Sequence, residues 1–289
     1  MKAIYVLMLI ALLAGCTSKD NSDAWGNFEA EETVLSARIA GNIIEMYVQE
    51  GDTVQAGELI AVTDTTDLAL SRSELQDNIR LLQLKQKAAT EKLQLGLTEK
   101  GNLQIEQQRF EKLLLQNATT QKQVDDINAN LRLKEQSLKL NNTEIQIAGS
   151  EINIAQTKLQ TINANIAKCY LKAPYEATVL STYAGKAEFV PTGKPIVKLA
   201  DMKNLKVVFY ISGSQLTSVK VGKEITVRID GAKKLETYSA KISYISSKAE
   251  FTPKVIQTRE ERTKLVYRVE AICVSNGSLK LGMPAEIVF

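Results

Sequence analysis

Cysteines are the residues in this chain best suited to chemistry, and they occur at positions 16, 169 and 273. The 289 residues include no histidine, which is the commonest general base and metal ligand in proteins. Lysine and arginine number 36 against 33 acidic residues, and the two signs are interspersed. Nucleic-acid binding needs a concentrated basic face, which this pattern does not offer. We therefore expect no catalytic site, no cofactor, no metal ion and no nucleic acid, so the protein is not expected to be an enzyme.

Cys16 ends an apolar N-terminal segment that runs from Ala3 to Ala14 after a single Lys2. Twelve residues are too few for a membrane-spanning helix, which needs about 20, but they fit the core of a signal peptide. Residues 13–16, Leu-Ala-Gly-Cys, resemble the bacterial lipobox, in which cleavage precedes the cysteine and the thiol receives diacylglycerol. We expect a signal peptide at 1–15, a lipidated linker at 16–25 and Cys16 as the membrane anchor. The alternative is an ordinary signal peptide with an unmodified cysteine.

The other two cysteines, Cys169 and Cys273, lie far apart in the sequence. An oxidising compartment permits a disulfide between them, but their spacing does not require one. We expect two separately buried thiols.

A further group of residues, Arg109, Leu113 and Thr120, flanks a break in a long helical pattern. Residues 117–120, Asn-Ala-Thr-Thr, are small and mostly polar. No glycine supplies a left-handed helix cap, so the turn is not expected to be a minimal loop. Arginine makes charge-assisted hydrogen bonds to carboxylates or carbonyls, and leucine fills apolar notches. The residues fit either docking to a partner or plain packing and capping, since the hydroxyl of Thr119 or Thr120 can cap the second helix.

The helical pattern extends from about residue 66 to 167 and contains a heptad repeat. Its second half carries apolar residues at every seventh position: Val124, Leu131, Leu138, Ile145, Ile152, Leu159 and Ile166. A sustained heptad is typical of a coiled-coil seam, and one short connection makes the two arms antiparallel. We predict a hairpin over 66–168, with arms of roughly 75 Å from about 50 residues at 1.5 Å each.

Two segments outside the helical pattern repeat each other 136 positions apart. Without a gap, Ala37 aligns with Ala173, Ile43 with Val179, Tyr47 with Tyr183, Val54 with Val190, Gly57 with Gly193 and Ile60 with Ile196. Alternating apolar residues punctuated by glycine are typical of short strands and tight turns. A half of about 30 residues cannot bury a core alone, so we predict that 26–65, with a first barrel strand, packs on 169–202.

The repeated segments resemble a known motif. GNIIEMYVQEGDTVQAGELIAVTD resembles one half of a biotinyl/lipoyl domain, and LKAPYEATVLSTYAGKAEFVPTGKPIVKLAD resembles the other. Carrier domains attach their cofactor to a lysine between the halves. Here no lysine lies between Glu58 and Leu70, which disfavours a carrier subunit of an enzyme.

From Leu205 onward, short alternating or apolar runs are separated by turns. Five or six such strands predict a small antiparallel β-barrel over 203–289. The predicted fold class is therefore mixed α and β. A lipoyl-type β-sandwich is split by a long antiparallel α-helical coiled-coil hairpin and is followed by the barrel.

Arg109, Leu113 and Thr120 have the spacing Arg-x3-Leu-x6-Ser of the hairpin tip in periplasmic adaptors of the HlyD-like membrane fusion family, with Thr in place of Ser. In that family these residues dock onto a TolC-like outer-membrane channel, which the resemblance implies here. It also implies an inner-membrane transporter as the second partner and self-association into hexamers. Residues 249–271 resemble the barrel domain of adaptors paired with ABC-type exporters, and LKLGMPAEIVF resembles the family's closing strand.

The function expected from this resemblance is that of an adaptor in a tripartite export or efflux system. The expected location is the periplasmic side of a Gram-negative cell envelope, lipid-anchored with the inner membrane favoured. Two alternatives stay open. One is an adaptor of a proton-driven, RND-type efflux pump, and the other is a non-transport structural lipoprotein with a coiled-coil spacer.

Overall fold

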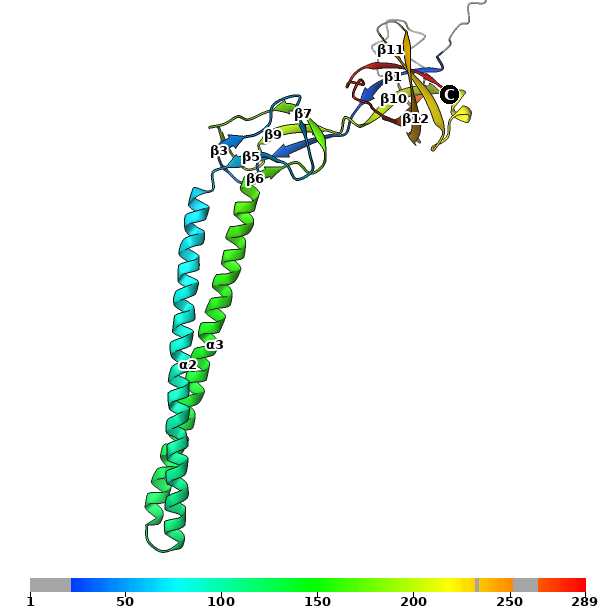
Figure 1. The fold of residues 1–289 in the computed structure, drawn as a ribbon. Coiled ribbons are helices and arrows are strands. Elements are labelled where there is room, and N and C mark those ends of the chain that lie inside the picture. The colour runs from blue at the N-terminus through cyan, green and yellow to red at the C-terminus, as the bar shows by residue number, and fades with distance from the viewer. Residues whose placement is uncertain (1–21, 232–233, 252–264) are drawn as a thin grey trace, which may run out of the picture.

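The computed structural model describes residues 22–231, 234–251 and 265–289. The expected signal peptide and Cys16 lie outside these residues. In Figure 1 three parts follow one another: a barrel, a sandwich, and a helical hairpin that projects from the sandwich. Within the described ranges, no helix combines the length and the apolar character needed to cross a membrane.

The sandwich consists of two four-stranded sheets. One has the order β2 (Glu32–Ser36), β9 (Pro195–Ala200), β7 (Ala177–Thr182), β4 (Thr53–Val54). The other has the order β6 (Tyr170–Lys172), β5 (Leu59–Thr63), β3 (Gly41–Met46), β8 (Phe189–Val190). Each sheet contains strands from before and after the hairpin, so the two repeated segments form one domain, as predicted.

The internal repeat has a structural counterpart. Strand β4 at 53–54 and strand β8 at 189–190 are equivalent by the 136-residue offset, and each pairs with a strand of the other half, β4 with β7 and β8 with β3. The aligned apolar pairs Ile43 and Val179, Val54 and Val190, and Ile60 and Ile196 are at most 1% exposed. The repeat therefore encodes a core to which both halves contribute equivalent side chains.

The hairpin consists of α2 (Thr66–Leu115) and α3 (Gln121–Cys169). Helix α2 starts beside Asp64, whose Oδ1 accepts hydrogen bonds from the Thr66 N–H at 2.9 Å and the Thr66 hydroxyl at 2.7 Å. These bonds stabilise the carboxylate and so lower the pKa of Asp64, and the bond from the Thr66 hydroxyl has the larger effect. The loop that leaves the sandwich is thus tied to the first turn of the helix.

The predicted heptad seam is confirmed as the contact between α2 and α3. Buried α3 residues include Val124, Leu131, Leu138, Ile152 and the companions Ile127, Ala148 and Ala155. Near the base, Ile79 and Leu82 of α2 cluster with Ile152 and Ala155. Farther along, a Cβ on Gly96 would lie 2.8 Å from Leu138 Cδ2. This glycine thus lets the second helix approach closely.

Ion pairs cross the seam on its exposed sides. Lys92 Nζ lies 3.1 Å from Glu144 Oε2, and Lys100 Nζ lies 2.8 Å from Glu135 Oε1. The hydrogen bond from Lys100 lowers the pKa of Glu135. Exposed pairs of this kind contribute little stability, about 0–1 kcal/mol, but they report the register of the two helices.

The barrel is built from strands at both ends of the described chain: β1 (Ala24–Glu29), β10 (Asn204–Ser212), β11 (Glu224–Asp230), β12 (Leu235–Ile245), β14 (Leu265–Val274) and β15 (Pro284–Val288). Their order is β10-β1-β15-β11-β12-β14, and pairing of β14 with β10 closes the circle. The short β13 (Glu250–Phe251) pairs with the first two residues of β14, and a 3-10 turn, Gln215–Ser218, follows β10. The predicted antiparallel barrel is therefore confirmed.

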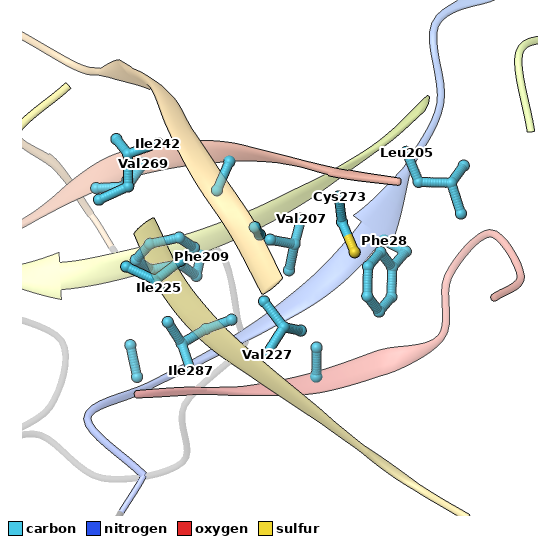
Figure 2. Close-up of a cluster of buried hydrophobic side chains, with 14 of the residues drawn as sticks. Phe28, Leu205, Val207, Phe209, Ile225, Val227, Ile242, Val269, Cys273 and Ile287 are labelled. Atoms are coloured by element: carbon cyan, nitrogen blue, oxygen red, sulfur yellow. The ribbon is translucent and has the colours of Figure 1, made fainter. Parts of the chain in front are cut away.

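Side chains fill the barrel interior. Figure 2 shows Phe28, Phe209 and Cys273 inside the same cluster, and all three are 0% exposed. Cys169 is buried separately, at the base of α3, and neither thiol is bonded to another. Burial raises the pKa of both thiols. The prediction of two separately buried thiols is confirmed.

Candidate docking site at the hairpin tip

The turn between α2 and α3 is a well-formed helix ending. Ala118 N–H donates to the Leu113 carbonyl at 2.8 Å, and Asn117 N–H donates to the Leu114 carbonyl at 2.9 Å. Asn117 has a φ of 55°, so it occupies the left-handed position that usually takes glycine. No glycine supplies the cap, as expected, and Asn117 supplies it instead, because asparagine adopts this conformation more readily than most residues.

Thr120 starts the second helix and confirms one of the two predicted caps. Its backbone is extended, with φ −103° and ψ 151°, and it forms a capping box with Gln123. The Thr120 N–H donates to Gln123 Oε1 at 3.2 Å. The hydroxyl of Thr119 donates to the same oxygen. Thr120 therefore has a structural role in the turn, and its side chain remains exposed.

Arg109 and Leu113 lie on the last two turns of α2. A spacing of four residues places them next to each other on one face of the helix. Arg109 is exposed and makes no ion pair with any residue that the structure describes, whereas Leu113 is half-buried. The structure thus gathers an unpaired guanidinium, a partly covered leucine and an exposed threonine at the end of the hairpin.

Leu115 is a further residue of the tip that the spacing did not identify. It is the last residue of α2, and its 85% exposure is the highest among the described large hydrophobic residues. A signal was present in the sequence. Leu114 is half-buried, and a residue directly after it is turned about 100° around the helix, out of the seam. The tip therefore exposes a second apolar side chain.

The side chains of the tip are suited to binding. A guanidinium reaches carbonyls or carboxylates, and an exposed leucine fits an apolar notch of a partner surface. Across the described residues, no group of three or more His, Cys, Asp and Glu side chains is placed to hold a metal ion. The tip lies at the end of the hairpin opposite the sandwich (Figure 1). Helices of 50 and 49 residues extend it about 75 Å from the sandwich.

Residues 31–201 match the model of the CzcB-like, barrel-sandwich hybrid domain. A "UPF0194 membrane protein" of Citrobacter koseri is 26% identical over 324 residues, covering 99% of this chain and 96% of the relative. The "UPF0194 membrane protein YbhG" of Salmonella gallinarum is 25% identical over 321 residues, covering 98% and 95%.

A similar fold occurs in the crystal structure of MacA from Actinobacillus actinomycetemcomitans. The TM-score is 0.61 with 24% sequence identity, and the match covers 91% of this chain and 76% of that one.

Proposed function

Because the chain belongs to the HlyD-like membrane fusion family, through its CzcB-like barrel-sandwich hybrid domain, we propose that it is the periplasmic adaptor of a tripartite export or efflux system. In this role it joins an inner-membrane transporter to a TolC-like outer-membrane channel. It acts through assembly, and its own residues carry out no chemical step.

One observation carries the proposal. The sandwich is interrupted at the position where carrier domains hold their cofactor lysine, and a hairpin of two helices with about 50 residues each is inserted at that position. A structural spacer needs length, but it does not need a split sandwich, a closed barrel and an exposed tip in one chain. All three features suit a protein that contacts one partner at its base and another at its tip.

At the tip, Arg109, Leu113 and Thr120 are the proposed contacts with the outer-membrane channel, and Leu115 adds apolar surface to them. At the other end, the barrel is the proposed contact with the transporter. The resemblance of residues 249–271 to adaptors of ABC-type exporters supports a transporter of that class, although residues 252–264 lie outside the described part of the chain. An RND-type pump is the alternative partner.

The bridging role is tested by purifying the tagged full-length chain after cross-linking in intact cells. We expect an inner-membrane transporter and an outer-membrane channel in one complex. An ATP-binding subunit in that complex would assign the ABC class, and a proton-driven pump would assign the alternative. A complex that contains neither type of partner would favour the structural lipoprotein instead.

Cys16 is the proposed lipid attachment site, on the periplasmic side of the inner membrane. Cys16→Ala removes the thiol that would carry the acyl chains, and each buried CH2 of those chains contributes about 0.8 kcal/mol to membrane binding. We expect the variant to be unacylated, and either released into the periplasm or held by an uncleaved signal peptide. Intact mass and detergent partition measure this. Detergent partition equal to that of the unchanged protein would rule out the anchor.

A further inference from the structure

The N-terminal segment joins the barrel at the end that lies away from the sandwich. Strand β1 begins there at Ala24 and ends at Glu29, beside the connection to the sandwich. Strand β10 is antiparallel to β1, so it leaves the sandwich at Asn204 and ends at Ser212 on the same far side. Figure 1 shows the C-terminus on the side of the barrel away from the sandwich. We call this part of the barrel the outer end.

Hydrogen bonds hold the entering chain at the outer end. The Ser22 hydroxyl donates to Glu286 Oε2 at 3.0 Å, and the Asp23 N–H donates to the Ile287 carbonyl at 2.8 Å. Asp23 Oδ2 also accepts a hydrogen bond from the Phe289 N–H at 2.9 Å. The chain is therefore fixed to the barrel from Ser22 onward.

This attachment limits the distance between the outer end and the membrane. Cys16, the proposed lipid attachment site, precedes Ser22 by six residues. A fully extended chain of that length spans at most about 21 Å. If Cys16 carries the anchor, the outer end therefore lies closer to the lipid surface than any other part of the described chain.

Four exposed apolar side chains are placed at the outer end, and none of them belongs to the core of the barrel. Their exposures are 64% for Trp25, 64% for Val221, 70% for Phe251 and 53% for Leu265. Exposed apolar side chains that gather at one end of a protein indicate an interaction site. We call these four residues the outer apolar group.

The strand register places Phe251 and Leu265 at the outer end. They pair with each other, and Leu265 comes directly before Val266. Val266 in turn pairs with Ser212, the last residue of β10. The Phe251–Leu265 pair therefore lies one residue beyond the end of the ladder between β10 and β14.

Val221 belongs to a turn at the same end. The Lys223 N–H donates to the Lys220 carbonyl at 3.0 Å and closes the turn. Lys223 Nζ donates to the Ser218 carbonyl at 2.7 Å and lies 5.9 Å from the centroid of the Phe289 ring. Because the Phe289 N–H is bonded to Asp23, the turn is linked to the point where the chain enters the barrel.

The charged side chains at the outer end have both signs. Lys220, Lys223 and Lys248 are exposed, and so are Glu224 and Glu250. These charges nearly balance, so attraction to anionic lipid is not expected to dominate. Apolar side chains that enter the membrane interface are the expected source of binding, and tryptophan suits this region because its ring is apolar and its N–H is polar.

We propose that the outer end of the barrel contacts the phospholipid surface directly, with the outer apolar group entering the headgroup region. The inference rests on the proposed function, because the linker brings this end to a membrane only if the N-terminus is anchored there. The contact adds a second attachment to the anchor, so it restricts rotation of the barrel about its linker. An inner-membrane transporter is the competing occupant of this surface.

The test uses Trp25, the only tryptophan of the chain, whose fluorescence reports the contact without a label. The full-length protein is purified from membranes and reconstituted alone into phosphatidylcholine vesicles. A second set of vesicles carries bromine on the acyl chains near the headgroups, where it quenches tryptophan on contact. We expect the Trp25 emission to shift to shorter wavelength in both sets and to lose intensity in the brominated one.

Phe251→Ser combined with Leu265→Ser should return the emission to that of an exposed indole and remove the quenching. The matched control combines Phe189→Ser on β8 with Leu70→Ser on α2, which are 60% and 61% exposed. The control should be quenched as strongly as the unchanged protein. Because Phe251 and Leu265 pair with each other, Val221→Ser in the separate turn is a second variant, and it should weaken the quenching. Circular dichroism melting checks that each variant is folded.

Intact mass of the same sample shows whether Cys16 is acylated. If it is not, a maleimide phospholipid coupled to Cys16 supplies the tether, because Cys169 and Cys273 are buried, have raised pKa values and react slowly. An unacylated chain counts against the anchor assignment alone, and the fluorescence of the tethered chain still decides the inference.

The vesicles contain no other protein, so a contact with the transporter cannot produce the signal. Equal Trp25 intensity in plain and brominated vesicles would overturn the inference and favour the transporter as the partner of this surface. Undiminished quenching in the variant with Phe251→Ser and Leu265→Ser would overturn it as well, since the outer apolar group would then not make the contact.

Discussion

Arg109→Asp is expected to abolish export while the protein stays folded and abundant. The side chain is exposed, and a charge reversal on an exposed helix usually shifts stability by less than about 0.5 kcal/mol. At a contact between proteins, reversing a charge places like charges together, and losing one partner of a buried charge pair costs about 2–5 kcal/mol. The functional loss should therefore far exceed the loss of stability. Export of the substrate in a strain that depends on the adaptor measures it.

Arg72→Asp is the matched control, because Arg72 is also exposed on α2 but lies near the base of the hairpin. It should leave export unchanged. Full export by Arg109→Asp would show that the arginine docks nothing.

Ile152→Asn should give the largest loss of stability in the hairpin. Ile152 is 7% exposed and packs with Ile79, Leu82 and Ala155. The substitution removes a large buried side chain, which costs about 2–5 kcal/mol for truncation to alanine. It also buries an amide, which costs a further 1–3 kcal/mol without a hydrogen-bond partner. The helical circular dichroism signal of the full chain should melt at a clearly lower temperature.

Ile105→Asn is the matched substitution on the surface, since Ile105 is 62% exposed. It should cost less than about 1 kcal/mol, mainly through helix propensity. If both variants melt at the temperature of the unchanged protein, the face that includes Ile152 is not the seam.

The hairpin and the split sandwich were predictable because both leave periodic signals in the sequence. The seam repeats every seven residues over most of α3, and residues at that spacing lie on one face of the helix. The sandwich halves align at a constant offset of 136 residues, which preserves the alternation of buried residues such as Ile43 and Val179. In both cases the periodic apolar residues are the ones that become buried, and these buried side chains form the core.

The barrel was predictable only as a set of strands. Its closure depends on β1 pairing with β10 and β15, and on β14 pairing with β10. These contacts join residues far apart in the chain, and no local pattern specifies them.

At the tip, the left-handed position is taken by Asn117, so a search for glycine missed it. The exposed apolar heptad of Leu133, Leu140, Ile147 and Ile154 was missed for another reason. The repeat is present in the sequence, but the stronger seam repeat accounts for the helix by itself. Only the structure shows that these residues remain exposed after α2 has packed against α3.

The central claim is that the tip of the hairpin contacts an outer-membrane channel, and thiol cross-linking in intact cells tests it most directly. A cysteine at Thr120 keeps the backbone N–H that bonds to Gln123, so the turn should be preserved. The account predicts a covalent adduct between this variant and the channel, and none from Leu70→Cys, which is 61% exposed near the base. Arg109→Asp should abolish the adduct. Failure of the Thr120 cysteine to capture the channel, or equal capture from position 70, would contradict the claim.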